Sequence, residues 1–132
     1  MENLSTTENL RNEFLKSWNY EMLHFSPELI ASVIDVIGKE IADGTMAYDL
    51  VKEYREQVYS DLVIKHKDDC KNIKHLEAKI IIDDGYREAK EEERKANKLV
   101  SLWKMRLKAI ETWVMMSCNL NNLESVKGRF QA

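Results

Sequence analysis

The sequence predicts an all-helical fold, in which a long antiparallel helical hairpin follows two shorter helices and copies of the chain assemble into a helical oligomer. Only four of the 132 residues are glycine and one is proline, which is too few for a turn-rich sandwich or barrel. Apolar residues recur every three or four positions along most of the chain, as on one face of a helix. The length is that of a single domain over 1–132, with an acidic helix pair in 1–44 and the hairpin with a C-terminal tail in 45–132.

Capping residues and apolar stripes predict the two short helices. Ser5 and Glu8 have the spacing of a capping box, which begins a helix. Ser26-Pro27 should end this helix and begin the next, because serine caps a helix and proline is tolerated at its first position. The second helix is expected to stop at Gly44. The two stripes consist of Leu10, Phe14, Trp18, Met22 and Phe25, and of Ile30, Val33, Ile34, Ile37 and Ile41.

The hairpin is predicted from two long segments of uninterrupted helical spacing. One helix is expected over about 46–82 and the other over about 86–120. Asp83-Asp84-Gly85 is the clearest turn signal in the second half of the chain, so the two helices should run antiparallel. The tail, 119–130, adds a last amphipathic turn or two.

The length of the hairpin predicts self-association. Two helices of 35–40 residues present more apolar surface than one chain of this size can cover, since helices in compact domains average about a dozen residues. A second copy of the chain is the simplest partner for the remaining stripe. The residues expected at this interface are Trp103, Leu107, Ile110, Trp113 and Val114, with contributions from Val58, Leu62, Ile73 and Leu76.

A basic strip is the strongest candidate for a binding site. Six cations of the second long helix fall within about 120° of one another at ~100° per residue. They are Arg87, Lys90, Arg94, Lys98, Lys104 and Lys108. Such a strip could follow the phosphates of a nucleic acid. No aromatic residue interleaves with it, and the plain alternative is the solvated face of an amphipathic helix.

The sequence contains no motif for catalysis, a metal or a cofactor. It has no nucleophile elbow, zinc-protease motif or glycine-rich phosphate loop. His66 and Cys70 share one helix face at this spacing, but a structural zinc takes four ligands. We therefore expect no catalytic residue, no metal and no cofactor.

The composition favours the cytoplasm and no membrane association. No apolar stretch approaches the ~20 residues of a membrane helix, and no secretory signal is visible. Two cysteines, Cys70 and Cys118, cannot form a disulfide framework and are expected to be reduced.

Segments 86–96 and 102–110, together with the tail 119–130, resemble the small helical proteins of bacteriophage recombination regions. Over about residues 50–130 the layout is similar to the recombination mediators of T4-type phages. The resemblance implies a helical ring oligomer that binds single-stranded DNA and helps to load a recombinase. The resemblance supplies no site residue, because the basic, aromatic DNA-binding segment in the N-terminal half of that family has no counterpart in this chain. Residues 1–64 of this chain instead carry 12 Asp/Glu against 5 Lys/Arg.

Two functions follow as hypotheses. The first is a non-enzymatic, phage-type accessory protein that acts in the host cell cytoplasm through self-association and through single-stranded DNA or a recombinase. The alternative is a phage-type inhibitor that blocks a host nuclease or a CRISPR or other defence complex. The acidic region favours the inhibitor, since carboxylates can mimic phosphate on a basic DNA-binding groove. The basic strip favours the first.

Overall fold

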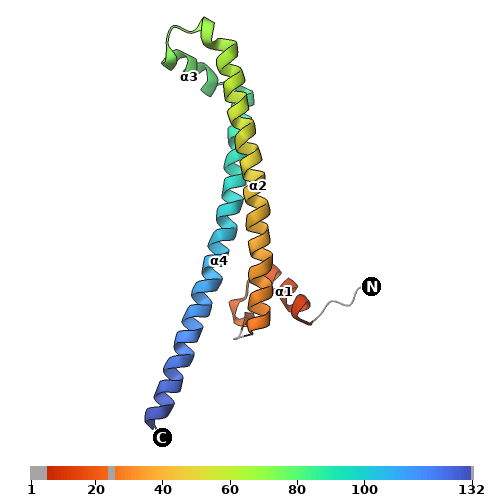
Figure 1. Cartoon of the computed structure of the whole chain (residues 1–132), viewed down its shortest axis with the longest axis vertical. Coiled ribbons are helices and arrows are strands. Elements are labelled where there is room, and N and C mark those ends of the chain that lie inside the picture. Colours follow the sequence, from red (N-terminus) through yellow and green to blue (C-terminus); the bar gives the residue numbers. More distant parts are fainter. Residues whose placement is uncertain (1–5, 24–25, 132) are drawn as a thin grey trace, which may run out of the picture. The chain divides into compact units, whose positions relative to one another are not determined.

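The computed structural model describes residues 6–23 and 26–131, with side chains up to Cys118. It contains four α-helices, α1 (Thr6–Ser17), α2 (Pro27–His66), α3 (Ile73–Ile81) and α4 (Asp84–Gln131) (Figure 1). Two short 3₁₀ helices, η1 (Tyr20–Leu23) and η2 (Lys67–Asp69), lie in the connections. No strand occurs in the described ranges, so the prediction of an all-helical chain is confirmed.

α1 ends earlier than the sequence predicted. It stops at Ser17, and Trp18 has a positive φ of 52°, while its N–H donates to the carbonyl of Phe14 at 2.7 Å. Side chains then compete for the next backbone donors: Ser17 Oγ accepts from the N–H of Asn19, whose Oδ1 accepts from the N–H of Glu21. The predicted continuation to residue 25 is therefore wrong. The proposed Ser5 cap lies outside the described residues.

The start of α2 agrees with the sequence, but its predicted stop does not. Ser26 Oγ accepts from the N–H of Leu29 at 3.4 Å, and Pro27 is the first helical residue, as expected. The helix passes through Gly44 to His66, so the predicted end at Gly44 is wrong. A Cβ at Gly44 would lie 3.1 Å from Val100 Cγ2 of α4. This glycine therefore permits a close approach of two helices and does not end one.

The expected helix over 46–82 is divided by a break at 67–72. η2 follows α2, and Cys70 has an extended backbone. Asn72 Oδ1 then caps α3 by accepting from the N–H of His75 at 2.8 Å. The apolar stripe is weakest here, so little packing opposes the cap. The turn before α4 was expected over Asp83–Gly85, whereas the helix already begins at Asp84 and continues beyond 120 to Gln131. Asp83 Oδ1 caps it through the N–H of Tyr86.

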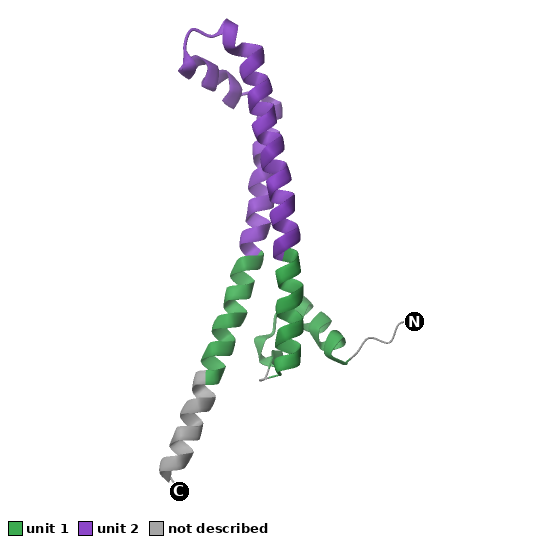
Figure 2. Ribbon diagram, viewed as in Figure 1, with its two compact units in different colours: residues 1–40, 103–132 green, residues 41–102 purple. Residues whose placement is uncertain are grey.

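The contacts divide the chain into two compact units (Figure 2). Unit 1 comprises 1–40 and 103–132, and unit 2 comprises 41–102. Unit 1 contains α1, η1, the first part of α2 and the last part of α4. Its fully buried side chains are Phe14, Leu23, Leu29, Val33, Ile37 and Ile110. Arg11 Nη1 donates to Ser32 Oγ at 3.3 Å and so joins α1 to α2.

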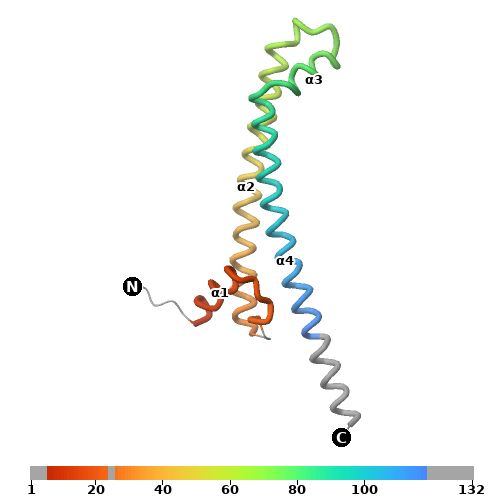
Figure 3. Tube along the Cα trace, turned by 180° about the vertical axis from the view of Figure 1, so that it is seen from behind, coloured from red at the N-terminus to blue at the C-terminus, as the bar shows by residue number. Residues whose placement is uncertain are grey.

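In unit 2, residues of α2 pack against α3 and α4. Leu62 of α2, Ile80 of α3 and Tyr86 of α4 form the buried cluster. Figure 3 shows the course of these three helices from behind. The rings of Tyr59 and Tyr86 lie 5.9 Å apart, centroid to centroid. No helix of the described part of the chain is long and apolar enough to cross a membrane.

Candidate nucleic-acid interface

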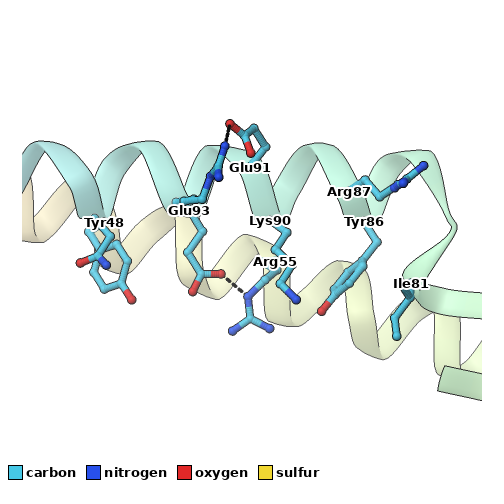
Figure 4. A pocket seen from close by; sticks show the side chains of 10 residues that line it. Tyr48, Arg55, Ile81, Tyr86, Arg87, Lys90, Glu91 and Glu93 are labelled. Carbon is cyan, nitrogen blue, oxygen red and sulfur yellow. Dashed lines mark hydrogen bonds and ion pairs between the residues drawn. The ribbon is translucent and has the colours of Figure 1, made fainter. Parts of the chain in front are cut away.

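A groove of about 800 Å³ in unit 2 collects most of the cations that this unit offers on α4 (Figure 4). We call it the cationic groove. Its charged and aromatic lining is Arg55, Arg87, Lys90 and Arg94, with Glu91 and Glu93, Tyr48 and Tyr86. Tyr48 and Arg55 come from α2, whereas the others come from α4. Four cations against two carboxylates give this groove a positive balance.

Arg55 is the most enclosed cation of the cationic groove. Its Nε donates to the carboxylate of Glu93, and the two side chains keep only 22% and 19% of their exposure. Burial acts to lower the pKa of Arg55, but the hydrogen bond and charge of Glu93, with a smaller contribution from Tyr86, raise it above its ordinary value. Arg55 is therefore a fixed positive charge whose guanidinium is oriented before any ligand arrives.

Lys90 and Arg87 are the cations of the cationic groove that no carboxylate of the described residues pairs with. Lys90 Nζ lies 5.8 Å from the ring centroid of Tyr86, a cation–π arrangement. Lys90, Arg55 and Tyr86 point to the same side of the helix pair, whereas Arg87 points away from it (Figure 4). The first three side chains thus lie together on one side of the groove, where the carboxylate of Glu93 also pairs with Arg55.

Arg94 is held by an exposed ion pair. Its Nη2 lies 2.7 Å from Glu91 Oε1, one turn away on the same helix. The hydrogen bond from Arg94 lowers the pKa of Glu91, and the same bond raises that of Arg94. Both groups are open to solvent, so the pair can open at small cost when a phosphate competes for the guanidinium.

The six residues of the predicted basic strip fall into three groups. Arg87, Lys90 and Arg94 line the cationic groove. Lys98 is exposed in unit 2 but does not line it. Lys104 and Lys108 are exposed in unit 1.

Sequence reasoning missed the two tyrosines and Arg55. Tyr86 lies on α4 itself, one turn before Lys90, whereas Tyr48 and Arg55 reach the groove from α2. Tyr48 and Arg55 are seven residues apart on α2, a spacing that places both on one helix face. That spacing was the available signal, but it identifies the groove only once the register between α2 and α4 is known.

The expected self-association residues lie mainly against their own chain. Ile110 has no exposed surface, and the ring of Trp103 lies 6.1 Å from that of Trp18, centroid to centroid. Leu107, Trp113 and Val114 are half-buried. The segment before α2 thus covers part of this stripe, since Trp18 lies against Trp103.

The other residues expected to contribute to self-association do not form one exposed surface either. Val58, Leu62 and Leu76 belong to the core cluster of unit 2. Ile73 alone is well exposed, at 73%.

Unit 1 has a second groove, of about 510 Å³ and almost wholly apolar, on one face of α4. We call it the apolar groove. It is lined by Tyr20, Met105, Lys108, Ala109, Thr112, Trp113 and Met116. Met105 and Met116 are 69% and 60% exposed, so this side of α4 is uncovered in the single chain.

Metal ligands do not gather in the described residues, where no three His, Cys, Asp or Glu side chains are placed to hold an ion. His66 ends α2 and Cys70 follows η2, so the helix face they were expected to share does not form.

Comparison of the chain with family models, with curated proteins and with solved structures finds no match.

Proposed function

We propose that this protein is a non-enzymatic accessory protein that binds single-stranded nucleic acid through the cationic groove of unit 2. The observation that carries the proposal is the convergence of Lys90, Arg55 and Tyr86 on one side of the helix pair. Cations supply phosphate contacts, and aromatic rings supply faces or edges for bases.

A single strand fits this combination better than a duplex does. Contact between bases and tyrosine rings requires unstacked, accessible bases, which a duplex does not offer. Tyr48 is half-buried and reaches the cationic groove from α2. Tyr86 is almost fully buried, and its ring is in cation–π contact with Lys90. Tyr48 is therefore the ring that would contact a base.

The phage setting implied by the resemblance extends this proposal. In that setting the protein assembles with copies of itself, each presenting α2 and α4 as an antiparallel hairpin, and helps a recombinase to load on single-stranded DNA in the host cytoplasm. Assembly would multiply a weak groove into useful avidity, because several grooves would engage one strand.

The direct test is binding of a fluorescent oligonucleotide, measured by anisotropy, for the wild type and for Lys90→Glu. We expect at least a tenfold loss of affinity, since a charge-assisted contact is worth about 1.5–3 kcal/mol. Lys74→Glu is the matched control, because Lys74 is exposed on α3 of the same unit and does not line the cationic groove. Equal losses in both variants would contradict the proposed site.

A second candidate function is inhibition of a basic, nucleic-acid-binding host protein. The observation that favours it is a row of exposed carboxylates on α2, consisting of Asp49, Glu53 and Glu56. These side chains can mimic the spacing of phosphates on a partner's groove. If the protein ignores oligonucleotides but prevents a host nuclease from binding DNA, and Glu53→Lys abolishes that effect, this second function replaces the first.

A further inference from the structure

α2 carries an apolar ridge that nothing covers in the single chain. Met46, Leu50 and Tyr54 are 67%, 66% and 63% exposed. Their spacing of four residues places them on one face of the helix, one above the other. Residues on the opposite side of α2, such as Leu62 and Arg55, make its contacts with α3 and α4. We call the three exposed residues the α2 ridge.

The charges beside the α2 ridge are mainly negative. At ~100° per residue, Asp49 and Glu53 border the ridge directly, and Glu56 lies beyond them. All three are exposed. Within the described residues, neither Asp49 nor Glu53 forms an ion pair with a cation. The ridge is therefore an apolar strip with an acidic border.

The apolar groove of unit 1 has the complementary character. Met105, Ala109 and Met116 lie on the exposed face of α4, and Lys108 is the charged residue of the lining. Lys104, one turn earlier, is also exposed and extends the basic border. The methionines suit a helix partner, because their flexible side chains adapt to an irregular apolar ridge.

The two surfaces also match in length. Met46 and Tyr54 are eight residues apart, or about 12 Å along a helix, and Met105 and Met116 are eleven apart, or about 16 Å. The ridge is thus shorter than the groove, and its acidic border can meet the basic border of the groove.

We propose that the α2 ridge of one copy of the chain docks into the apolar groove of a second copy. The ridge and the groove are different surfaces, so the contact is heterologous, and each copy keeps one free ridge and one free groove for further copies. This inference rests on the self-association in the proposed function, but it does not depend on binding of nucleic acid.

Sedimentation velocity of the full chain tests the contact. We expect the wild type to associate as its concentration rises to about 200 µM, and Leu50→Lys on the ridge and Met105→Glu in the groove each to be monomeric. Ile73→Lys, which alters an equally exposed residue on α3, should associate like the wild type. A monomeric wild type over this range would overturn the proposal and leave the groove to an acidic helix of another protein.

Mixing the two monomeric variants separates this contact from any symmetric one. Leu50→Lys retains an intact groove and Met105→Glu an intact ridge, so an equimolar mixture should form a 1:1 dimer and stop there. A mixture that stays monomeric would overturn the heterologous contact. Circular dichroism confirms that each variant is folded, and Tyr54→Ser replaces Leu50→Lys if the latter is not.

A charge exchange tests the borders. Lys108→Glu should weaken association, and adding Glu53→Lys to the same chain should restore it at least in part. Failure to restore it would contradict the alignment of the acidic border with Lys108. Sedimentation velocity of Lys90→Glu, which leaves the ridge and the apolar groove intact and should associate like the wild type, distinguishes loss of nucleic-acid binding from loss of assembly.

Discussion

Arg55 of α2 and Glu93 of α4 form an ion pair across 38 residues of sequence, with both side chains mostly covered. The pair fixes the register between the two helices of unit 2. It also places the guanidinium of Arg55 in the cationic groove beside Lys90, where it adds positive charge without being free to move.

Removing the acidic partner should destabilise unit 2. In Glu93→Ala, Arg55 remains charged in a partly covered site without its carboxylate. We expect a loss of about 1–2 kcal/mol in the free energy of unfolding, between the values for exposed and fully buried pairs. Urea denaturation followed by circular dichroism measures it. Glu92→Ala, at an exposed neighbour, is the control and should change the stability by less than ~0.5 kcal/mol.

Phe14 should be the residue whose truncation costs unit 1 most. It has no exposed surface and packs edge-on against Trp18 and Tyr20. Phe14→Ala leaves a cavity under both rings, and we expect a loss of about 3–5 kcal/mol. Tryptophan fluorescence during denaturation reports it, because Trp18 and Trp103 lie in this unit. A loss below ~1 kcal/mol would contradict this core.

Two glycines of α2 should respond differently to the same substitution. A Cβ at Gly38 meets nothing within 4 Å, so Gly38→Ala should stabilise the helix by about 0.5–1 kcal/mol. Gly44→Ala should gain less or lose stability, because its Cβ would lie 3.1 Å from Val100 Cγ2. Thermal melting of the two variants gives the comparison. Equal gains would contradict the close approach of the helices at Gly44.

The exposed pair of Glu91 and Arg94 predicts a pH dependence that NMR can follow. The pKa of Glu91 is lowered below its ordinary value of 4.5, chiefly by the hydrogen bond from Arg94. A lowered pKa means that the pair contributes to stability above about pH 4.5 and loses that contribution as the pH falls through the folded-state pKa. In Arg94→Ala, the midpoint of the Glu91 carboxyl titration should rise towards 4.5. An unchanged midpoint would contradict the pairing.

Local chemistry made part of the fold predictable. Ser26 and Pro27 begin α2 as expected, because capping and the fixed φ of proline depend only on neighbouring residues. The predicted helix end at Gly44 was wrong, since the cost of a glycine in a helix is offset here by contact with Val100, which is distant in sequence. The left-handed Trp18 gave no sequence signal either, because that conformation is unusual for a tryptophan.

The residues of the candidate site were likewise predictable only where they depend on local spacing. Arg87, Lys90 and Arg94 were found from their spacing on one helix. Tyr48 and Arg55 were missed because their part in the groove depends on the packing of α2 against α4. The burial of Ile110 was also out of reach, since periodicity identifies an apolar stripe but does not say which segment covers it.

Tyr48 and Lys90 should affect nucleic-acid binding in different ways. Tyr48→Ala removes a ring contact worth about 1–3 kcal/mol, so affinity should fall about tenfold while its dependence on salt stays the same. Lys90→Ala removes a phosphate contact, so both affinity and salt dependence should fall. Anisotropy titrations at several salt concentrations distinguish them, and a changed salt slope for Tyr48→Ala would contradict its assignment as a base contact.

The salt dependence of oligonucleotide binding by the wild type tests the central claim most directly. If Lys90, Arg55 and Arg94 contact phosphates, the logarithm of the binding constant should fall linearly with the logarithm of salt concentration, with a slope of about −0.7 for each contact, or about −2 in total. Lys90→Ala should reduce that slope by about 0.7. Absence of binding at about 50 mM salt, at protein concentrations where copies associate, would contradict the proposed function.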